Sequence, residues 1–214
     1  MTRDWVRWHD AYDDPGSGLS TRLALVQAHL SAALAAAPDG PIRVVSLCAG
    51  QGRDVISVLP GHPRQDDVMA LLVELDPSNA ATARAQAAAA GLPGVTVREA
   101  DAGIVTSYAD ALPAGVLMLC GIFGNVSDED IHRTVAASAG MCAPGGTVLW
   151  TRHRRPPDVT GQIRSWFAAA GFEEVAFESP DTTTMTGVGV HRCLAAASSE
   201  PPDGGRLFTF RSDR

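Results

Sequence analysis

The chain has no long apolar run. No stretch of its 214 residues approaches the roughly 20 consecutive apolar residues that a membrane-spanning helix needs. Residues 1–14 (MTRDWVRWHDAYDD) also lack an apolar stretch, which argues against a secretory signal. We therefore expect a cytoplasmic protein without a membrane partner.

Cysteine is scarce and widely spaced. The four cysteines, Cys48, Cys120, Cys142 and Cys193, form no CxxC pair. Zinc sites and redox motifs usually have closely spaced cysteines, so the spacing predicts no metal site. In a reducing cytosol these residues are expected to be small buried hydrophobic side chains.

Basic residues are outnumbered by acidic ones. Lys and Arg total 17 against 24 Asp and Glu, which gives a net charge of −7. This balance argues against a broad nucleic-acid surface. Hydrophobic residues make up 45% of the chain, an ordinary share for a globular protein. Because there is no internal repeat and no long linker, residues 1–214 are expected to form one domain of undetermined oligomeric state.

Short apolar runs alternate with helical patterns along the chain. Runs rich in branched residues are typical of strands buried on both faces, and apolar residues three and four apart indicate helices. The alternation predicts an α/β fold with a mostly parallel sheet covered on both faces, formed by residues 42–211 and preceded by a helical cap over 1–38. The predicted strands are 42–48, 68–74, 95–99, 115–120, 147–152, 173–179 and 206–211, and the predicted helices include 19–36, 77–90 and 127–141.

Ligands of such sheets bind beyond the carboxyl ends of the strands, so site residues are expected in the loops that follow them. The first such loop contains Ala49, Gly50 and Gly52. Its glycines let the backbone approach a ligand closely, although a glycine turn without a ligand stays an open alternative. A dinucleotide fingerprint would have a third glycine where Val55 stands.

Glu74 ends the second predicted strand and is followed by Leu75. A carboxylate here can accept from both hydroxyls of a ribose, and each charge-assisted bond contributes roughly 1.5–3 kcal/mol. Several adenosine cofactors contain such a ribose, so Glu74 alone does not choose among them. Asp76 competes for this role, but its place before Pro77 suits a helix N-cap better.

The loops after the third and fourth predicted strands supply further candidates. Asp101 can accept from the exocyclic amine of an adenine and Ala102 leaves room for the ring, while capping of the next short helix is the alternative role for Asp101. After the fourth strand, Cys120 and Gly121 open a hydrophobic turn in which the backbone can approach a ligand. In the same turn, Phe123 and Asn125 are candidates to face a substrate.

These four loops, in this order and spacing, resemble those of the class I S-adenosylmethionine-dependent methyltransferases. The resemblance runs from about residue 42 to residue 179, and 143–150 (APGGTVLW) and 171–177 (GFEEVAF) also look like the entries into strands five and six of that family. It implies a Rossmann-like three-layer sandwich whose seven-stranded sheet has its last strand antiparallel. It also implies S-adenosyl-L-methionine as cofactor, with S-adenosyl-L-homocysteine as product.

The resemblance also implies roles for individual residues. The glycine turn would meet the methionine part, Glu74 the ribose and Asp101 the adenine. Arg53, Arg22 and the backbone amides near Gly52 are all candidate partners of the methionine carboxylate. The chain departs from the family at three positions: Ser46 stands where an acidic residue is common, Cys48 where glycine is common, and Gly115 where aspartate is common.

A small-molecule methyl acceptor is expected, and its contacts are the least determined part of the site. His9 and Tyr12 lie on a predicted N-terminal helix and are candidates for a base or an orienting group, with core packing as the alternative. His153 lies in the basic cluster 151–157 after strand five, where solvated loop charges are the alternative. The segment 182–192 is a third candidate region by location alone.

Two other functions compete with this interpretation. An NAD(P)-dependent oxidoreductase shares the sheet and the ribose carboxylate, but Val55 breaks its glycine fingerprint. A catalytically inactive adenosyl-binding module would keep the cavity without the reaction.

Overall fold

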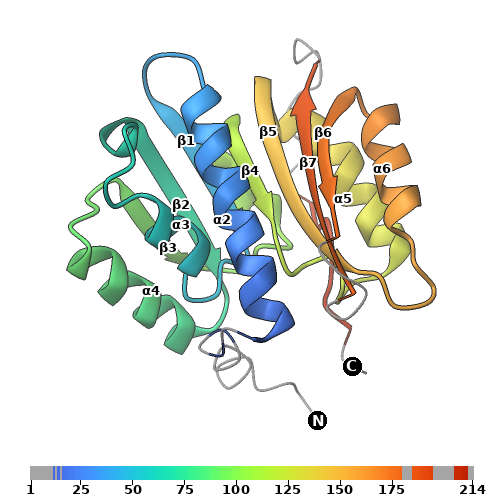
Figure 1. The fold of residues 1–214 in the computed structure, drawn as a ribbon, viewed down its shortest axis with the longest axis horizontal. Helices are drawn as coiled ribbons and strands as arrows, with labels where there is room; N and C mark the ends of the chain where they lie inside the picture. The colour runs from blue at the N-terminus through green and yellow to red at the C-terminus, as the bar shows by residue number, and fades with distance from the viewer. Residues whose placement is uncertain (1–11, 13, 15, 180–184, 195–204, 212–214) are drawn as a thin grey trace.

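Seven strands form one mixed sheet in the order β3-β2-β1-β4-β5-β7-β6 (Figure 1). This computed structural model describes residues 12, 14, 16–179, 185–194 and 205–211. The sheet is parallel except for β7, which runs antiparallel to both of its neighbours, β5 and β6. The strands are β1 (Ile42–Leu47), β2 (Val68–Glu74), β3 (Val95–Glu99), β4 (Ala114–Leu119), β5 (Cys142–His153), β6 (Phe172–Glu178) and β7 (Thr186–Cys193).

Helices cover both faces of the sheet, as the predicted three-layer sandwich requires. Figure 1 shows α2, α3 and α4 in front of the sheet and α5 and α6 behind it. Two buried apolar clusters match these layers: one includes Leu30 and Ile56 from the front helices, and the other includes Val135 and Phe167 from the rear helices. The helices are α2 (Gly18–Ala36), α3 (Arg53–Val58), α4 (Pro77–Ala89), α5 (Asp128–Met141) and α6 (Thr160–Ala169).

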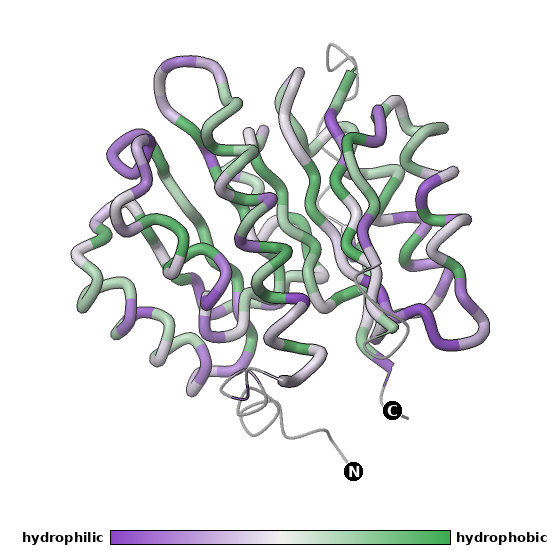
Figure 2. The backbone as a smooth tube through the Cα atoms, in the orientation of Figure 1, coloured by the Kyte–Doolittle hydropathy of each residue, from purple (hydrophilic) through white to green (hydrophobic). Residues whose placement is uncertain are grey.

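The central strands are buried on both faces, which explains their continuous apolar runs. Figure 2 shows these strands coloured as hydrophobic, with hydrophilic segments on the helices and loops around them. The chain passes from the β3 edge back to β4, which lies on the other side of β1. The order of the strands therefore reverses between β1 and β4, where a ligand crevice is expected.

Helices α4 and α5 each begin at a side-chain N-cap, and the cap at Asp76 was predicted. The Asp76 carboxylate accepts from the backbone amides of Ser78 and Asn79 at 2.9 and 3.0 Å. The Ser127 hydroxyl accepts from the amide of Asp130 at 3.0 Å. Asp76 is therefore engaged in starting α4.

The seventh strand was predicted at 206–211, and this position is wrong: β7 is Thr186–Cys193. Gly187 and Gly189 lower the strand propensity of this segment, so the sequence does not indicate a strand here. The packing of neighbouring side chains nevertheless requires glycine at both positions. A Cβ atom at Gly189 would lie 2.2 Å from Cε2 of Trp150, and one at Gly187 would lie 2.7 Å from Cζ of Phe177. The glycines of β7 therefore make room for aromatic rings of β5 and β6.

Residues 205–211 instead form an extended segment, here called the C-terminal strap. Within the part of the chain that the structure describes, its only strand-type pairing is an isolated bridge between Arg206 and Ile104. Leu207 and Phe208 of the strap are buried in the rear core cluster. Their burial explains why this segment is as apolar as a strand.

Candidate functional site

A cavity of about 610 Å³ lies at the carboxyl ends of β1 to β4. This volume is within the usual range of small-molecule and cofactor sites. Four strand-end loops, the start of α2 and the C-terminal strap contribute to its lining. The lining residues are Tyr12, Arg22, Cys48, Ala49, Gly50, Asp54, Glu74, Leu75, Asp76, Pro77, Asn79, Asp101, Cys120, Gly121, Arg206, Phe208, Thr209 and Phe210.

The two glycines of the first loop have different roles. Gly50 lines the cavity and has a φ of +57°. Gly52 has a φ of +69° but is absent from the lining, and a Cβ atom there would lie 2.7 Å from Leu72 and 2.8 Å from Ile56. Gly52 therefore permits α3 to pack against β2, whereas Gly50 exposes backbone to the cavity.

Glu74 is held in place by the loops on either side of it. One carboxylate oxygen accepts from the backbone amide of Gly50 at 2.7 Å, and the other accepts from the amide of Asp76 at 2.8 Å. The residue is 8% exposed and faces the cavity. Each carboxylate oxygen can accept more than one hydrogen bond, so Glu74 can still accept from a ligand.

Asp101 also faces the cavity, but Ala102 does not. One oxygen of Asp101 accepts from the backbone amide of Gly103 at 2.8 Å, and the other lies 2.8 Å from Nη2 of Arg206. Ala102 is buried in the rear core cluster. Ala102 therefore anchors this loop to the core and does not contact a ligand in the cavity.

Cys120 and Gly121 line the cavity beyond β4. The amide of Gly121 donates to the hydroxyl of Thr151 at 2.9 Å, and its carbonyl accepts from the Asn125 side chain at 2.7 Å. Phe123 is fully buried, with its ring centroid 5.9 Å from that of Trp150. Phe123 is a core residue, so the expectation that it faces a substrate is not met.

Polar side chains of mixed charge surround one part of the cavity. Arg22, in the first turns of α2, donates to the phenol oxygen of Tyr12. The guanidinium carbon of Arg53 lies 5.6 Å from the Tyr12 ring centroid, but Arg53 is not among the lining residues. Asp54 lines the same region from the first turn of α3.

Burial raises several pKa values in this region. Desolvation raises the pKa of the Asp54 carboxyl and of the Tyr12 phenol above their usual values. It also raises the pKa of the Cys48 and Cys120 thiols. At neutral pH Tyr12 and both cysteines are therefore uncharged, so Tyr12 suits hydrogen bonding better than proton abstraction.

Of the three catalytic candidates, one does not line the cavity and one lies outside the described residues. His153 ends β5, where its Nε2 contacts Nη1 of Arg152 and its Cδ2 is 3.4 Å from a Cβ atom built at Gly124. It is not among the cavity-lining residues. His9 lies outside the described residues, as does most of the predicted N-terminal helix. Tyr12 is therefore the one catalytic candidate that the structure places in the cavity wall.

Sequence reasoning missed several lining residues. Asp54 and Asn79 lie in the first turns of their helices, where polar residues usually face solvent. The strap residues Arg206, Phe208 and Phe210 were assigned to a strand. Of these residues, Asp54 could have been found from the sequence, because it directly follows the glycine turn and Arg53, which were already candidates for the site.

The chemistry of the lining suits an adenosine cofactor. Two carboxylates, Glu74 and Asp101, face the cavity with backbone amides fixing their positions. Carboxylates accept hydrogen bonds only, which matches ribose hydroxyls and an exocyclic amine. Among the described residues, no group of three or more His, Cys, Asp or Glu side chains is placed to hold a metal ion.

Residues 16–164 match the model of a protein family described as "Putative methyltransferase", and the match covers more than half of the chain. A comparison with curated proteins finds no match.

Solved structures resemble the fold at low sequence identity. An O-methyltransferase family protein from Burkholderia thailandensis has a TM-score of 0.63 and 18% identity over 81% of this chain. The match spans 55% of that protein, just over half of its length. Magnesium protoporphyrin IX methyltransferase from Synechocystis PCC 6803 with bound S-adenosylmethionine has a TM-score of 0.66 and 13% identity over 88% of this chain and 90% of that one. An rRNA methylase from Streptococcus thermophilus has a TM-score of 0.59 and 11% identity over 78% and 95%.

Proposed function

The chain belongs to the class I family of S-adenosylmethionine-dependent methyltransferases, and on that premise we propose that it methylates a small molecule. The observation that supports this proposal best is the cavity that Glu74, Asp101 and the Gly50 turn line together. When bound there, S-adenosylmethionine supplies a sulfonium methyl group for in-line displacement by the acceptor, with S-adenosylhomocysteine as the product.

Glu74 holds the ribose in this proposal. Its carboxylate is fixed by the amides of Gly50 and Asp76, so binding the ribose hydroxyls costs little additional ordering. Asp101 accepts from the exocyclic amine of the adenine. Leu75 contributes apolar surface beside the base, since it is 66% exposed and lines the cavity.

Another part of the cavity wall suits an amino acid. Arg22 and Asp54 carry complementary groups within the same wall, next to the Gly50 turn. Arg22 binds the methionine carboxylate, and Asp54 accepts from the methionine amino group. An ammonium group close to Asp54 would stabilise the charged form of a carboxyl whose pKa burial otherwise raises.

Tyr12 orients the acceptor, because its neutral phenol can both donate and accept hydrogen bonds. Cys120 and Gly121 also line the cavity, and their small size leaves space for an acceptor to approach. His9 remains a candidate for a base where the acceptor must lose a proton, whereas His153 does not line the cavity. Positioning of the acceptor alone can lower the activation free energy of such a transfer by roughly 7–11 kcal/mol.

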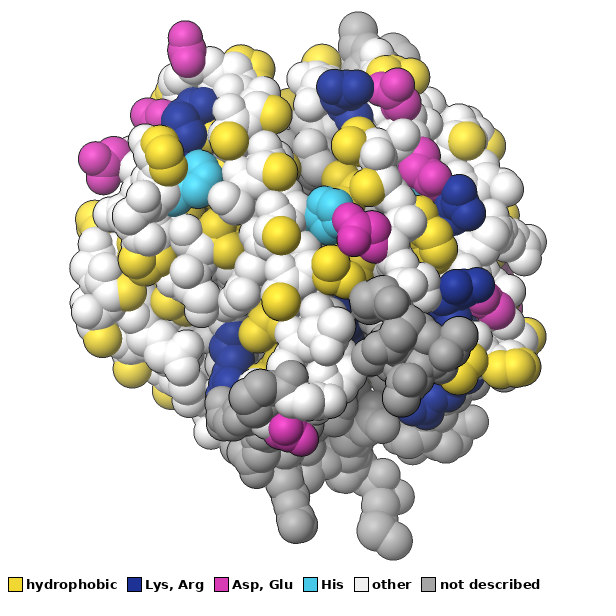
Figure 3. Space-filling view, viewed as in Figure 1, with side chains coloured by type: hydrophobic (Ala, Val, Ile, Leu, Met, Phe, Trp, Pro, Cys, Tyr) yellow, Lys and Arg dark blue, Asp and Glu magenta, His cyan; other side chains and the backbone are white. Residues whose placement is uncertain are grey.

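A small-molecule acceptor agrees with the charge of the chain. The net charge is −7, and Figure 3 shows basic side chains scattered among acidic ones on the face that it displays. Nucleic-acid surfaces instead gather basic side chains. No helix among the described residues is long and apolar enough to cross a membrane.

Calorimetry tests the cofactor assignment. We expect S-adenosylmethionine and S-adenosylhomocysteine to bind and NADH not to bind. Glu74→Ala should weaken S-adenosylhomocysteine binding by about 2–4 kcal/mol, because it deletes a charged hydrogen-bonding partner. Glu74→Gln keeps the shape of the side chain and should lose part of that affinity.

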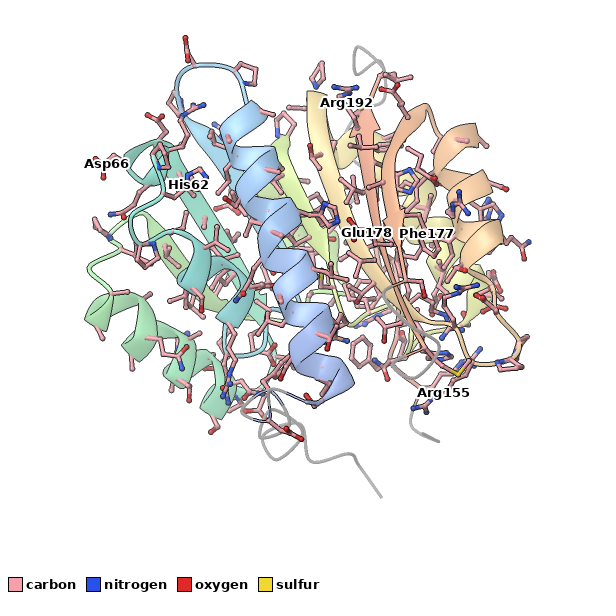
Figure 4. The ribbon with its side chains drawn as sticks, viewed as in Figure 1. His62, Asp66, Arg155, Phe177, Glu178 and Arg192 are labelled. Carbon is pink, nitrogen blue, oxygen red and sulfur yellow. The ribbon has the colours of Figure 1, made fainter. Side chains whose placement is uncertain are left out.

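Glu178→Gln is the matched control, since Glu178 of β6 (Figure 4) pairs with His29 of α2 and is not among the residues that line the cavity. This variant should bind as the wild type does. Binding of NADH without S-adenosylhomocysteine would contradict the assignment. For the acceptor, labelled methyl groups should enter the metabolite fraction of an extract, and labelling of the RNA fraction alone would contradict a small-molecule acceptor.

A further inference from the structure

The C-terminal strap is tied to the site from both sides. The Leu207 amide donates to the carbonyl of Gly103 at 2.7 Å, and the Arg211 amide donates to the carbonyl of Asn125 at 2.8 Å. Gly103 follows Asp101 in the loop after β3, and Asn125 lies in the loop after β4. The strap therefore bridges the two loops that flank the proposed adenine position.

The strap lies so close to the β3 loop that only glycine fits beneath it. A Cβ atom at Gly103 would lie 2.4 Å from the carbonyl oxygen of Phe208. Leu207 and Phe208 are buried, so the strap is anchored in the core as well as by hydrogen bonds. This anchoring fixes the backbone on which Arg206 stands.

Arg206 reaches from the strap to Asp101. Its Nη2 lies 2.8 Å from one Asp101 oxygen, and its Nη1 donates to the Phe208 carbonyl at 3.3 Å. The Gly103 amide holds the other Asp101 oxygen. Both carboxylate oxygens are thus oriented from one side, while the pair itself faces the cavity.

We infer that the C-terminal strap is part of the cofactor site and that Arg206 is a positioning residue, which aims the Asp101 carboxylate at the exocyclic amine of the adenine. This inference rests on the proposed function. It assigns base recognition to a segment outside residues 16–164, the range of the family match. Phe208 and Phe210, whose ring centroids are 6.0 Å apart, form the apolar wall beside the base.

The reason that a positioning residue is needed is geometric. The side chain of Asp101 is 34% exposed, so without Arg206 its carboxylate would be restrained by the Gly103 amide alone. A charge-assisted hydrogen bond depends on alignment. Pre-orienting the carboxylate removes an ordering cost at the moment when the base binds.

The test measures the affinities of two variants, each lacking one arginine of the strap, for two ligands. Arg206→Ala and Arg211→Ala remove the same charge from the same segment, but Arg211 does not line the cavity. The ligands are S-adenosylhomocysteine and its analogue in which hydrogen replaces the exocyclic amine. Arg206→Ala should weaken S-adenosylhomocysteine about tenfold and the analogue less than about threefold, because the analogue cannot donate to Asp101. Arg211→Ala should change neither affinity by more than about twofold.

A double-mutant cycle shows whether Arg206 acts through Asp101. In an Asp101→Asn background, adding Arg206→Ala should weaken S-adenosylhomocysteine by less than about threefold. Arg206 is nearly half exposed, so its variants are expected to fold, as urea unfolding would verify. Equal losses for both ligands, or tighter binding of S-adenosylhomocysteine by Arg206→Ala, would overturn the inference.

Failure of this inference is distinguishable from failure of the proposed function. If the wild type does not bind S-adenosylhomocysteine, the proposed function fails. If the wild type binds it and Glu74→Ala weakens binding while Arg206→Ala leaves it unchanged, only the role of the strap fails.

Discussion

Cys48 adopts a backbone conformation that usually belongs to glycine. Its φ is +54°, at the position where the resemblance to the methyltransferase family expects glycine. A side chain in this left-handed region costs about 1–2 kcal/mol. The departure from the family pattern therefore keeps the turn and adds backbone strain to it.

Replacing Cys48 in two ways separates this strain from the packing of the thiol. Cys48→Gly and Cys48→Ala both remove the sulfur, but only glycine relieves the strain. We expect Cys48→Gly to be about 1 kcal/mol more stable than Cys48→Ala, because the relief exceeds the entropy that glycine adds to the unfolded chain. Urea unfolding of the two variants measures the difference. If Cys48→Ala were as stable as Cys48→Gly, the backbone at residue 48 would not be strained.

At the same scale, the sequence predicted the types of site residue better than their roles. Glu74 and Asp101 face the cavity as their strand-end positions suggested. Gly52 and Ala102 also lie in strand-end loops but serve packing. Whether a loop residue points toward the cavity or into the core depends on the neighbouring layer, which its local sequence does not contain.

Among the elements, β1 to β5 followed from their apolar runs, whereas β7 did not. The glycines of β7 reduce its local strand propensity. They are required because Trp150 and Phe177 pack over them, and this requirement arises only when the sheet has formed. The apolar residues of the C-terminal strap misled for the complementary reason, since Leu207 and Phe208 are buried in the rear core cluster although the strap does not join the sheet.

The same aromatic packing makes β7 sensitive to acid. His191 on β7 is 1% exposed, and its ring lies 4.4 Å from the Phe167 ring, centroid to centroid. Neither of its ring nitrogens has a hydrogen-bond partner among the described residues. Burial lowers the pKa of His191 to about 4, while Glu174 opposes this shift and Arg164 adds to it.

Stability should therefore fall as the pH falls from about 6.5 to about 4. In that window the unfolded chain binds a proton that the folded chain excludes, which costs up to roughly 3 kcal/mol in the free energy of unfolding. His191→Phe keeps the stacking and should flatten this part of the pH profile. Urea unfolding at a series of pH values provides the test, and an unchanged slope in the variant would assign the loss to other groups.

At the scale of the whole molecule, the cavity depends on segments far apart in the chain. Tyr12 and the C-terminal strap line the same cavity as the loops after β1 to β4. The four loops were predictable because parallel strands end at one edge of a sheet. The strap was not, since nothing in its own sequence indicates which loops it crosses.

Because several segments meet around one ligand, binding should stabilise the whole fold. At a concentration of S-adenosylhomocysteine one hundred times its Kd, the free energy of unfolding should rise by about 2.7 kcal/mol. For a chain of this size that corresponds to a rise in Tm of about 5–10 °C. Thermal unfolding with and without ligand measures the rise. Glu74→Ala should lose most of it at the same ligand concentration, whereas Glu178→Gln should keep it.

The insertion of β7 between β5 and β6 leaves β6 as an edge of the sheet. Open edges can pair with strands of other molecules and start aggregation. Three of the seven residues of β6 are glutamates, and its pairing with β7 shifts register between Glu174 and Ala176. These glutamates pair with Arg192, Arg164 and His29, so a docking strand would have to displace or desolvate these pairs, and the local irregularity would interrupt its hydrogen-bond register. The resistance of the folded protein to edge-to-edge association therefore depends on the ion-paired, irregular edge that β6 presents.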